Sequence, residues 1–95
     1  GDAVPDRLGA GLHALSDNTR LNILKLLSEK PMSQVEIAKK LRLRAPTISH
    51  HLKNLRIAAL ITKTYTETEK PDIRYSLRTG RIDEICEALK TFLGH

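Results

Sequence analysis

Residues 33–57 constrain the fold more than any other stretch, because they predict two helices with a short turn between them. Ser33 followed three residues later by Glu36 is the pattern of a capping box, in which each side chain satisfies a backbone amide at the start of a helix. Pro46 is compatible with the first turn of the second helix, where the amides have no helical partners. Apolar residues recur at helical spacing in both segments: Ile37, Ala38 and Leu41 in the first, and Ile48, Leu52 and Leu55 in the second. The stretch therefore predicts a helix–turn–helix.

The second of these helices is expected to carry polar side chains on the face opposite its apolar one. At about 100° per residue, that face gathers Pro46, Thr47, His50, Lys53, Asn54 and Ile57. Hydroxyl, imidazole, ammonium and amide groups can hydrogen-bond to base edges and phosphates. A solvated polar face without a ligand is the alternative interpretation of the same pattern.

Positive charge is concentrated on the same stretch. The chain has a net charge of +5, and residues 33–63 hold seven basic side chains against the single acid Glu36. A localised basic patch indicates a polyanionic partner. Membrane surfaces and acidic proteins are alternatives, but neither accounts for the hydrogen-bonding side chains. The residues that we expect to contact DNA are Arg42, Arg44, Thr47, Ser49, His50, Lys53, Asn54, Lys63 and Arg74.

The segment before the helix–turn–helix predicts two further helices. The first carries a stripe of leucines at helical spacing: Leu8, Leu12 and Leu15. The second is expected to begin after the N-cap Asp17 and to end by Pro31, because the residue before a proline avoids helical backbone angles. Residues 1–6 are small or charged and include a proline, so they are expected to be loose.

The segment after the helix–turn–helix predicts a β-hairpin and a last helix. Residues 61–66 are mostly β-branched or aromatic, and residues 73–77 alternate between apolar and polar, so both predict strands, joined by the charged loop 68–72. Thr79-Gly80 is expected to break the chain before the last helix. That helix carries Ile82, Ile85, Leu89, Phe92 and Leu93. The order α-α-α-α-β-β-α, mainly α with a small β-hairpin, is that of a single winged helix–turn–helix domain over residues 1–95.

Composition and motifs argue against several other classes of protein. The single cysteine, Cys86, excludes an internal disulfide and fits a reducing cytoplasm. No apolar run approaches the ~20 residues needed to span a bilayer. There is no serine–histidine–acid spacing, no glycine-rich phosphate loop and no carboxylate pair in a credible cleft, so we expect no enzyme activity and no cofactor. Gly1 in place of Met suggests a processed or excised start.

Two segments resemble the ArsR-type bacterial and archaeal repressors. Residues 15–24, Leu-Ser-Asp-Asn-Thr-Arg-Leu-Asn-Ile-Leu, resemble that family's opening, L-(A/S)-D-P-T-R-L-x-I-L. Residues 45–56, Ala-Pro-Thr-Ile-Ser-His-His-Leu-Lys-Asn-Leu-Arg, resemble its recognition helix, Q-P-(T/A)-(I/V)-S-x-H-L-x-x-L. The similarity covers about residues 8–93. It implies a symmetric dimer that binds double-stranded DNA at a palindromic operator and blocks transcription.

The resemblance also implies that the dimer forms through the first and last helices. The apolar stripes of these two helices are large for so small a domain, which agrees with an interface. The candidate interface residues are Leu8, Leu12, Leu15, Ile85, Leu89 and Phe92. The alternative is that both stripes pack inside one chain.

The sequence departs from the family pattern in three places. Ala59 stands where glycine is usual after the recognition helix, and Arg44 stands where a serine often caps it. The Cys-x-Cys of the family's arsenic and cadmium sensors is missing, because the corresponding helix reads Val-Glu-Ile-Ala-Lys-Lys at residues 35–40. The Asp-x-His of its zinc sensors is replaced by Asp83-Glu84-Ile85, so no metal site is expected. A redox or metal role for Cys86 stays open.

Two adjacent histidines are expected to have different roles. On a helix His50 and His51 diverge by about 100° and cannot chelate one ion. His50 faces outward and is assigned to DNA, whereas His51 tilts toward the core and is assigned to hydrogen bonding with neighbours. The patch and the polar face together predict a sequence-specific DNA-binding regulator. The alternatives are a winged-helix protein-interaction module and the DNA-binding domain of a larger regulator.

Overall fold

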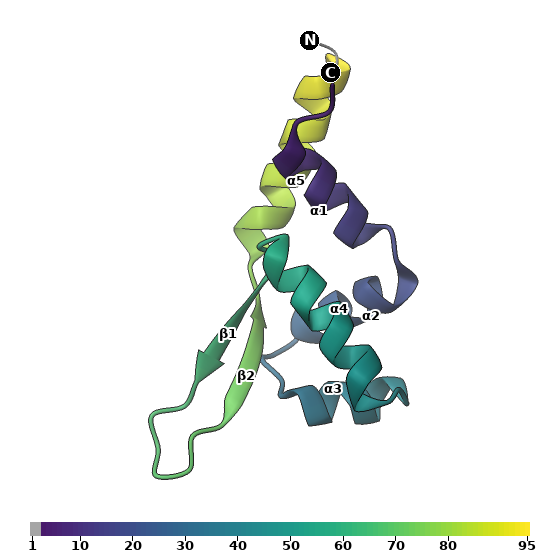
Figure 1. Cartoon of the computed structure of the whole chain (residues 1–95). Coiled ribbons are helices and arrows are strands. Elements are labelled where there is room, and N and C mark those ends of the chain that lie inside the picture. The colour runs from purple at the N-terminus through teal and green to yellow at the C-terminus, as the bar shows by residue number, and fades with distance from the viewer. Residues whose placement is uncertain (1–2) are drawn as a thin grey trace.

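The computed structural model describes residues 3–95, which fold into helices and one antiparallel hairpin (Figure 1). In chain order the elements are α1 (Asp6–Leu15), α2 (Asn18–Leu27), α3 (Gln34–Leu41), α4 (Ala45–Ile57), β1 (Ile61–Tyr65), β2 (Ile73–Leu77) and α5 (Thr79–Leu93). This order confirms the predicted winged helix–turn–helix, with α3 and α4 as the helix–turn–helix and β1 and β2 as the wing. Within the described residues, none of the helices has the length and apolar character needed to cross a membrane.

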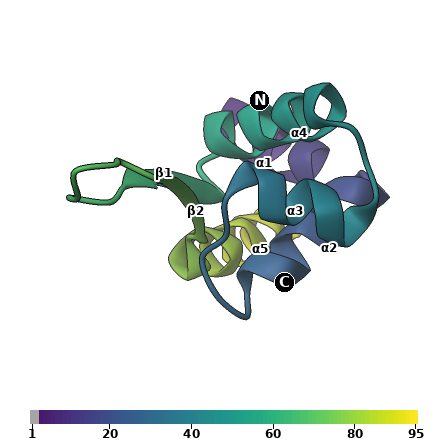
Figure 2. The same cartoon turned by 90° about the horizontal axis from the view of Figure 1, so that it is seen from below.

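The elements form a helical body, an arm and a wing. The body consists of α2, α3 and α4, and the arm consists of α1 and α5, which lie side by side so that the start of α1 and the end of α5 share one end of the molecule (Figure 1). Seen from below, the wing projects to one side of the helices (Figure 2). The molecule is elongated, with extents of 51 × 27 × 21 Å.

Local capping contacts start two helices where the sequence predicts them. The Asp17 carboxylate accepts a hydrogen bond of 3.0 Å from the backbone amide of Arg20, which confirms Asp17 as the N-cap of α2. The Glu36 amide donates to the Ser33 hydroxyl at 3.2 Å, and the Ser33 amide donates to the Glu36 carboxylate at 3.4 Å. The predicted capping box is therefore confirmed.

Two predicted boundaries need correction. The expected loose start overlaps α1, which already begins at Asp6; residues 1 and 2 lie outside the described residues. Thr79-Gly80 does not break the chain, because both residues belong to the first turn of α5. A methyl group added at Gly80 would meet no atom within 4 Å, so packing does not require glycine at this position.

Branched aliphatic side chains fill the core. The large side chains that are fully buried are Ile23, Ile37, Ile48, Leu52, Leu55, Leu60 and Ile85. Three apolar residues of α2 are buried in this core and Leu26 is partly buried against it, but Leu21 is 44% exposed. Helix α2 therefore keeps one large apolar side chain in solvent.

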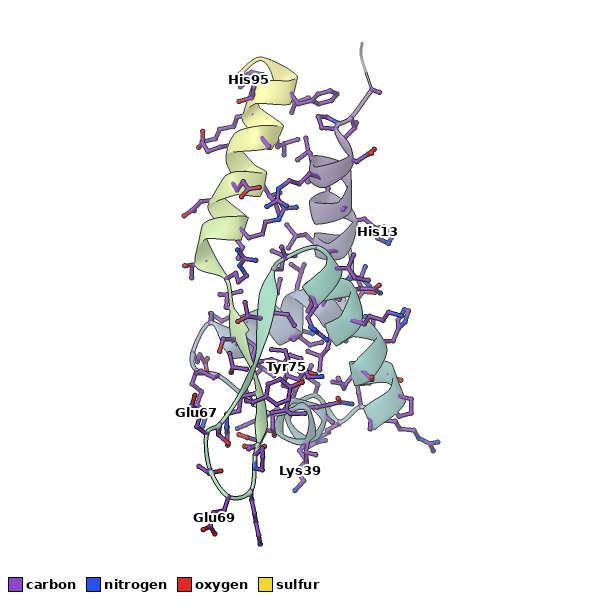
Figure 3. All side chains as sticks on the ribbon, turned by 60° about the vertical axis from the view of Figure 1, so that its left-hand side comes forward. His13, Lys39, Glu67, Glu69, Tyr75 and His95 are labelled. Atoms are coloured by element: carbon purple, nitrogen blue, oxygen red, sulfur yellow. The ribbon has the colours of Figure 1, made fainter. Side chains whose placement is uncertain are left out.

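The wing is attached to the body through Tyr75. In the hairpin register Lys63 pairs with Tyr75 and Tyr65 pairs with Ile73. The Tyr75 amide donates to the Met32 carbonyl at 2.8 Å, and the Met32 amide donates back to the Tyr75 carbonyl at 3.1 Å. The Tyr75 side chain is buried between the hairpin and the helices (Figure 3). Ile73, an apolar residue on the same face of β2 as Tyr75, lies next to the loop and is 37% exposed.

Candidate nucleic-acid interface

Helix α4 presents a polar surface to solvent and an apolar one to the core. Its buried residues are Ile48, Leu52 and Leu55, as predicted. Four residues that the sequence assigned to DNA are exposed, namely Thr47, Ser49, His50 and Lys53, and a fifth, Asn54, is half-buried. The structure therefore leaves the predicted contact side chains of this helix open to a ligand.

Two arginines flank the turn that leads into α4. Arg42 ends α3 with a left-handed backbone, φ 56°, and Arg44 is the N-cap of α4 without a capping side-chain hydrogen bond. Both residues are exposed. The partial positive charge of a helix N-terminus adds to theirs, so the start of α4 suits a phosphate group. At the other end of α4, Ala59 keeps the left-handed backbone that is usual for glycine, with φ 60°.

The two adjacent histidines point to different partners, as predicted. The Asn54 side-chain amide nitrogen lies 3.3 Å from Nε2 of His50, so these residues form a pair on the outer face. Nδ1 of His51 lies 3.3 Å from Nη1 of the buried Arg20. Because a guanidinium group has only donors, His51 accepts this hydrogen bond. His51 therefore has the structural role that the sequence indicated.

A basic groove lies between the end of α4 and β1. It encloses about 540 Å³ and is lined by Lys53, Arg56, Ile57, Ile61, Thr62 and Lys63. Three of these residues are cationic and none is acidic, so a chain of phosphates could be neutralised here. Lys63 also lies over the Tyr65 ring, with Nζ 5.8 Å from the ring centroid. Arg56 was not among the residues that the sequence assigned to DNA, although its spacing of three residues from Lys53 places the two on neighbouring positions of the helix surface.

Arg74, which was expected to contact DNA, is engaged by acids of its own chain. Its Nη1 lies 2.9 Å from the carboxylate of Glu36, and its Nε lies 3.1 Å from that of Asp72. Hydrogen bonds from the backbone and hydroxyl of Ser33, assisted by Arg74, hold the pKa of Glu36 below its ordinary value. These two ion pairs hold the guanidinium between the wing and α3, and the Arg74 side chain stays 38% exposed.

The tip of the wing is acidic. Glu67 and Glu69 lie at the far end of the hairpin, away from the helices (Figure 3). Lys70 is the one cation among residues 66–72, which also include Asp72. The loop therefore repels a polyanion, whereas Lys63 in the middle of β1 attracts one.

The apolar residues of the arm divide between the interior and the surface. Leu8 and Ile85 are buried within the chain, with 3% and 2% of their surface exposed. Leu12, Leu15 and Leu89 are partly buried against the core, and Phe92 is 40% exposed. The end of the arm also exposes Val4 and Leu93. A partner surface could therefore reach the second group of predicted interface residues but not Leu8 or Ile85.

Side chains with metal-binding chemistry are scattered over the structure. Cys86 is free and exposed on α5. Within residues 3–95, no three histidine, cysteine, aspartate or glutamate side chains come together as a set that could hold a metal ion.

Comparisons with known proteins agree with these features. The profile of the family "Bacterial regulatory protein, arsR family" matches residues 17–63. The chain is 33% identical over 78 residues to the arsenical resistance operon repressor of Staphylococcus aureus, an alignment that covers 82% of this chain and 72% of that protein. It is 34% identical over 80 residues to the transcriptional repressor SdpR of Bacillus subtilis (strain 168), covering 84% and 86%.

A solved structure extends this similarity to the fold. An ArsR-like transcriptional regulator from Rhodococcus sp. RHA1 matches with a TM-score of 0.82 and 25% sequence identity, covering 93% of this chain and 80% of that one. The match therefore takes in the arm and the wing as well as the helix–turn–helix. Because sequence and structure agree over most of the chain, the protein belongs to the arsR family of bacterial regulatory proteins and is a DNA-binding transcriptional regulator.

Proposed function

We propose that this regulator binds a palindromic operator as a homodimer and represses transcription. The observation that carries the proposal is the continuity between the exposed polar surface of α4 and the basic groove beside it. Repression rests on the similarity to two proteins named as repressors. Such a protein acts on chromosomal DNA, so we place it in the cytoplasm. The proposal includes no catalytic step.

Docking follows from the dimensions of the two partners. The major groove of B-DNA is about 12 Å wide and admits one α-helix. With α4 in the groove, Thr47, Ser49 and His50 in its first half face base edges, as recognition helices commonly arrange them. The basic groove at the other end of α4 then meets the phosphate backbone at the groove edge. Arg42 and Arg44 reach phosphates at the start of the helix.

Dimerisation is proposed to occur through the arm. Phe92 and its partly buried neighbours Leu12, Leu15 and Leu89 would pack against the same residues of a second copy. A two-fold axis along such an interface gives two copies of α4 on one side of the dimer. For DNA recognition these must be about 34–36 Å apart, one helical turn of the duplex.

Selection from a random duplex pool, followed by titration at several salt concentrations, tests the DNA-binding proposal. If Lys53, Arg56 and Lys63 each contact a phosphate, the two basic grooves of a dimer together neutralise about six phosphates. The slope of log affinity against log salt should then be at least as steep as about −5. A slope near zero, or no binding in dilute buffer, would refute the proposal.

Sedimentation equilibrium tests the dimer. The Phe92→Asp variant places a charge on the exposed end of the arm and should convert dimers to monomers. Leu21→Asp is a matched control, because Leu21 is similarly exposed but lies on α2. A monomeric wild-type protein at micromolar concentration, or equal effects of the two substitutions, would contradict the proposed interface.

A further inference from the structure

Two arginines are buried, and both connect the arm to α4. Arg20 and Arg81 expose 6% and 4% of their surface. A buried guanidinium group is rare unless its donors are satisfied. Here the acceptors belong mainly to other elements, so each side chain fixes the relative position of the elements that it joins.

Arg81, on α5, reaches the end of the recognition helix. Its Nε donates to the carbonyl of Ala58, the residue after α4, at 2.8 Å. Its Nη2 donates to the carbonyl of Arg7 on α1 at 2.8 Å, and its Nη1 donates to the Glu84 carboxylate at 3.0 Å. The Glu84 carboxylate also accepts from the Arg7 side chain. One side chain therefore ties both helices of the arm to the C-terminal end of α4.

Arg20, on α2, makes a second connection nearer the middle of α4. Its Nε donates to the Ala14 carbonyl at 2.7 Å and its Nη2 to the His13 carbonyl at 3.0 Å, both in the last turn of α1. Its Nη1 donates to His51 on α4 at 3.3 Å. Apart from these links, α1 packs on α2 and α5, and α4 packs on α2, α3 and β1. The two guanidinium groups thus hold α4 and the arm at two separated points.

We infer that Arg20 and Arg81 are positioning residues that set the angle between the arm and α4, and thereby the spacing of half-sites that a dimer accepts. This inference rests on the proposed dimeric DNA binding. The arm acts as a lever, because α5 alone is about 22 Å long at 1.5 Å per residue. A tilt of about 10° over about 20 Å moves the far end by about 3.5 Å, close to the rise of one base pair. A small change at either arginine would therefore change the half-site spacing that the dimer fits by about one base pair.

The experiment measures how sharply each variant discriminates half-site spacing. Wild type first selects its preferred duplex from a random pool. From that sequence we make a duplex with a single half-site and a series of palindromes in which the distance between half-sites is longer or shorter by one or two base pairs. The test variants are Arg81→Met and Arg20→Met, which keep apolar volume and remove the donors. Arg7→Ala is the matched control, since it removes a side-chain contact to Glu84 but leaves the backbone carbonyl that Arg81 uses.

Wild type and Arg7→Ala should lose about tenfold in affinity for each base pair of altered spacing, because the DNA must then be twisted to fit. Arg81→Met and Arg20→Met should lose about threefold or less, while their affinity for the single half-site stays close to that of wild type. A purely structural role would instead weaken all duplexes equally. Where a methionine variant does not fold, as judged by circular dichroism, the lysine variant at the same position keeps the charge and is measured in its place.

The outcomes separate the inference from the proposed function. Folded variants that keep the wild-type spacing preference would overturn the positioning role while leaving DNA binding intact. Variants that lose single-site and palindrome affinity in equal proportion would overturn it as well. A wild-type protein that binds no duplex in dilute buffer would refute the proposed function, and the positioning role would fall with it.

Discussion

Replacing Gly11 with alanine should destabilise this protein, although alanine is the better helix former. Gly11 lies in α1 where it meets α5. A methyl group at its Cα would lie 2.7 Å from Cδ1 and 2.8 Å from Cγ1 of Ile85, and 3.1 Å from Nη2 of Arg81. Carbon atoms in contact prefer about 3.5–4.0 Å. The two helices of the arm would therefore have to separate, or the buried Ile85 would have to leave its rotamer.

The magnitude follows from two opposing effects. Overpacking a well-packed site costs about 1–3 kcal/mol, and alanine gains about 1 kcal/mol over glycine inside a helix. Gly9→Ala is the matched control, because its methyl group would meet only Cγ1 of Val4, at an ordinary 3.8 Å. Both variants gain the higher helix propensity of alanine, so only the overpacking distinguishes them. Gly11→Ala should therefore be less stable than Gly9→Ala by about 1–3 kcal/mol. Each 1 kcal/mol corresponds to about 4–8 °C in Tm for a domain of this size.

Urea denaturation followed by circular dichroism measures the difference in the free energy of unfolding. All variants are measured at one protein concentration, because the stability of the proposed dimer would depend on it. Ile85→Val provides a second check, since it removes Cδ1. This substitution should lower the free energy of unfolding by about 0.5–1.5 kcal/mol in wild type. It should lower it by less in the Gly11→Ala background, because there it relieves the close contact with the new methyl group. The reasoning is refuted if Gly11→Ala is as stable as Gly9→Ala, or if Ile85→Val costs the same in both backgrounds.

The remaining predictions concern DNA binding and pH. His50→Ala should cost about 1–3 kcal/mol at one base position and relax preference there, whereas Lys53→Ala should weaken all sequences alike; equal losses on selected and random duplex would contradict this division. Replacing Glu67 and Glu69 with glutamine should raise DNA affinity severalfold, as measured by fluorescence anisotropy. Each carboxylate about 10 Å from a phosphate weakens the binding free energy by about 0.4 kcal/mol. The gain in affinity should vanish at high salt, which screens this repulsion. The pKa of Glu36 is lowered from its ordinary 4.5, so its contribution to stability is complete above pH 4.5 and is lost as the pH falls through the depressed pKa. In thermal unfolding, wild type should lose more stability below pH 4.5 than Glu36→Gln, and parallel curves would contradict this.

The features that the sequence predicted correctly depend on neighbours along the chain. Asp17 and the pair Ser33 and Glu36 form hydrogen bonds within three residues, so their roles can be recognised from spacing alone. The buried and exposed faces of α4 follow in the same way from helical periodicity. The prediction that Thr79-Gly80 breaks the chain was wrong, because these two residue types occur both in turns and in the first turn of a helix.

Other features depend on residues that are distant in the sequence. Arg81 donates to a carbonyl 74 residues away, and Arg74 pairs with Glu36 38 residues away. A periodicity argument treats such arginines as surface cations. It also identifies the apolar stripes of the arm without deciding which members face inward, which is why Leu8 and Ile85 were grouped with Phe92. The burial of these residues is a property of how α1 and α5 pack together.

The double hydrogen bond between Met32 and Tyr75 has a consequence for how this fold tolerates change. It joins the middle of β2 to the segment that enters α3, so the strand stays attached to the helical body when the outer loop changes. Lengthening or trimming residues 66–72 should therefore leave the DNA-facing helix in place. That loop is the position at which this protein could accept a new sequence without changing how α4 sits in the fold.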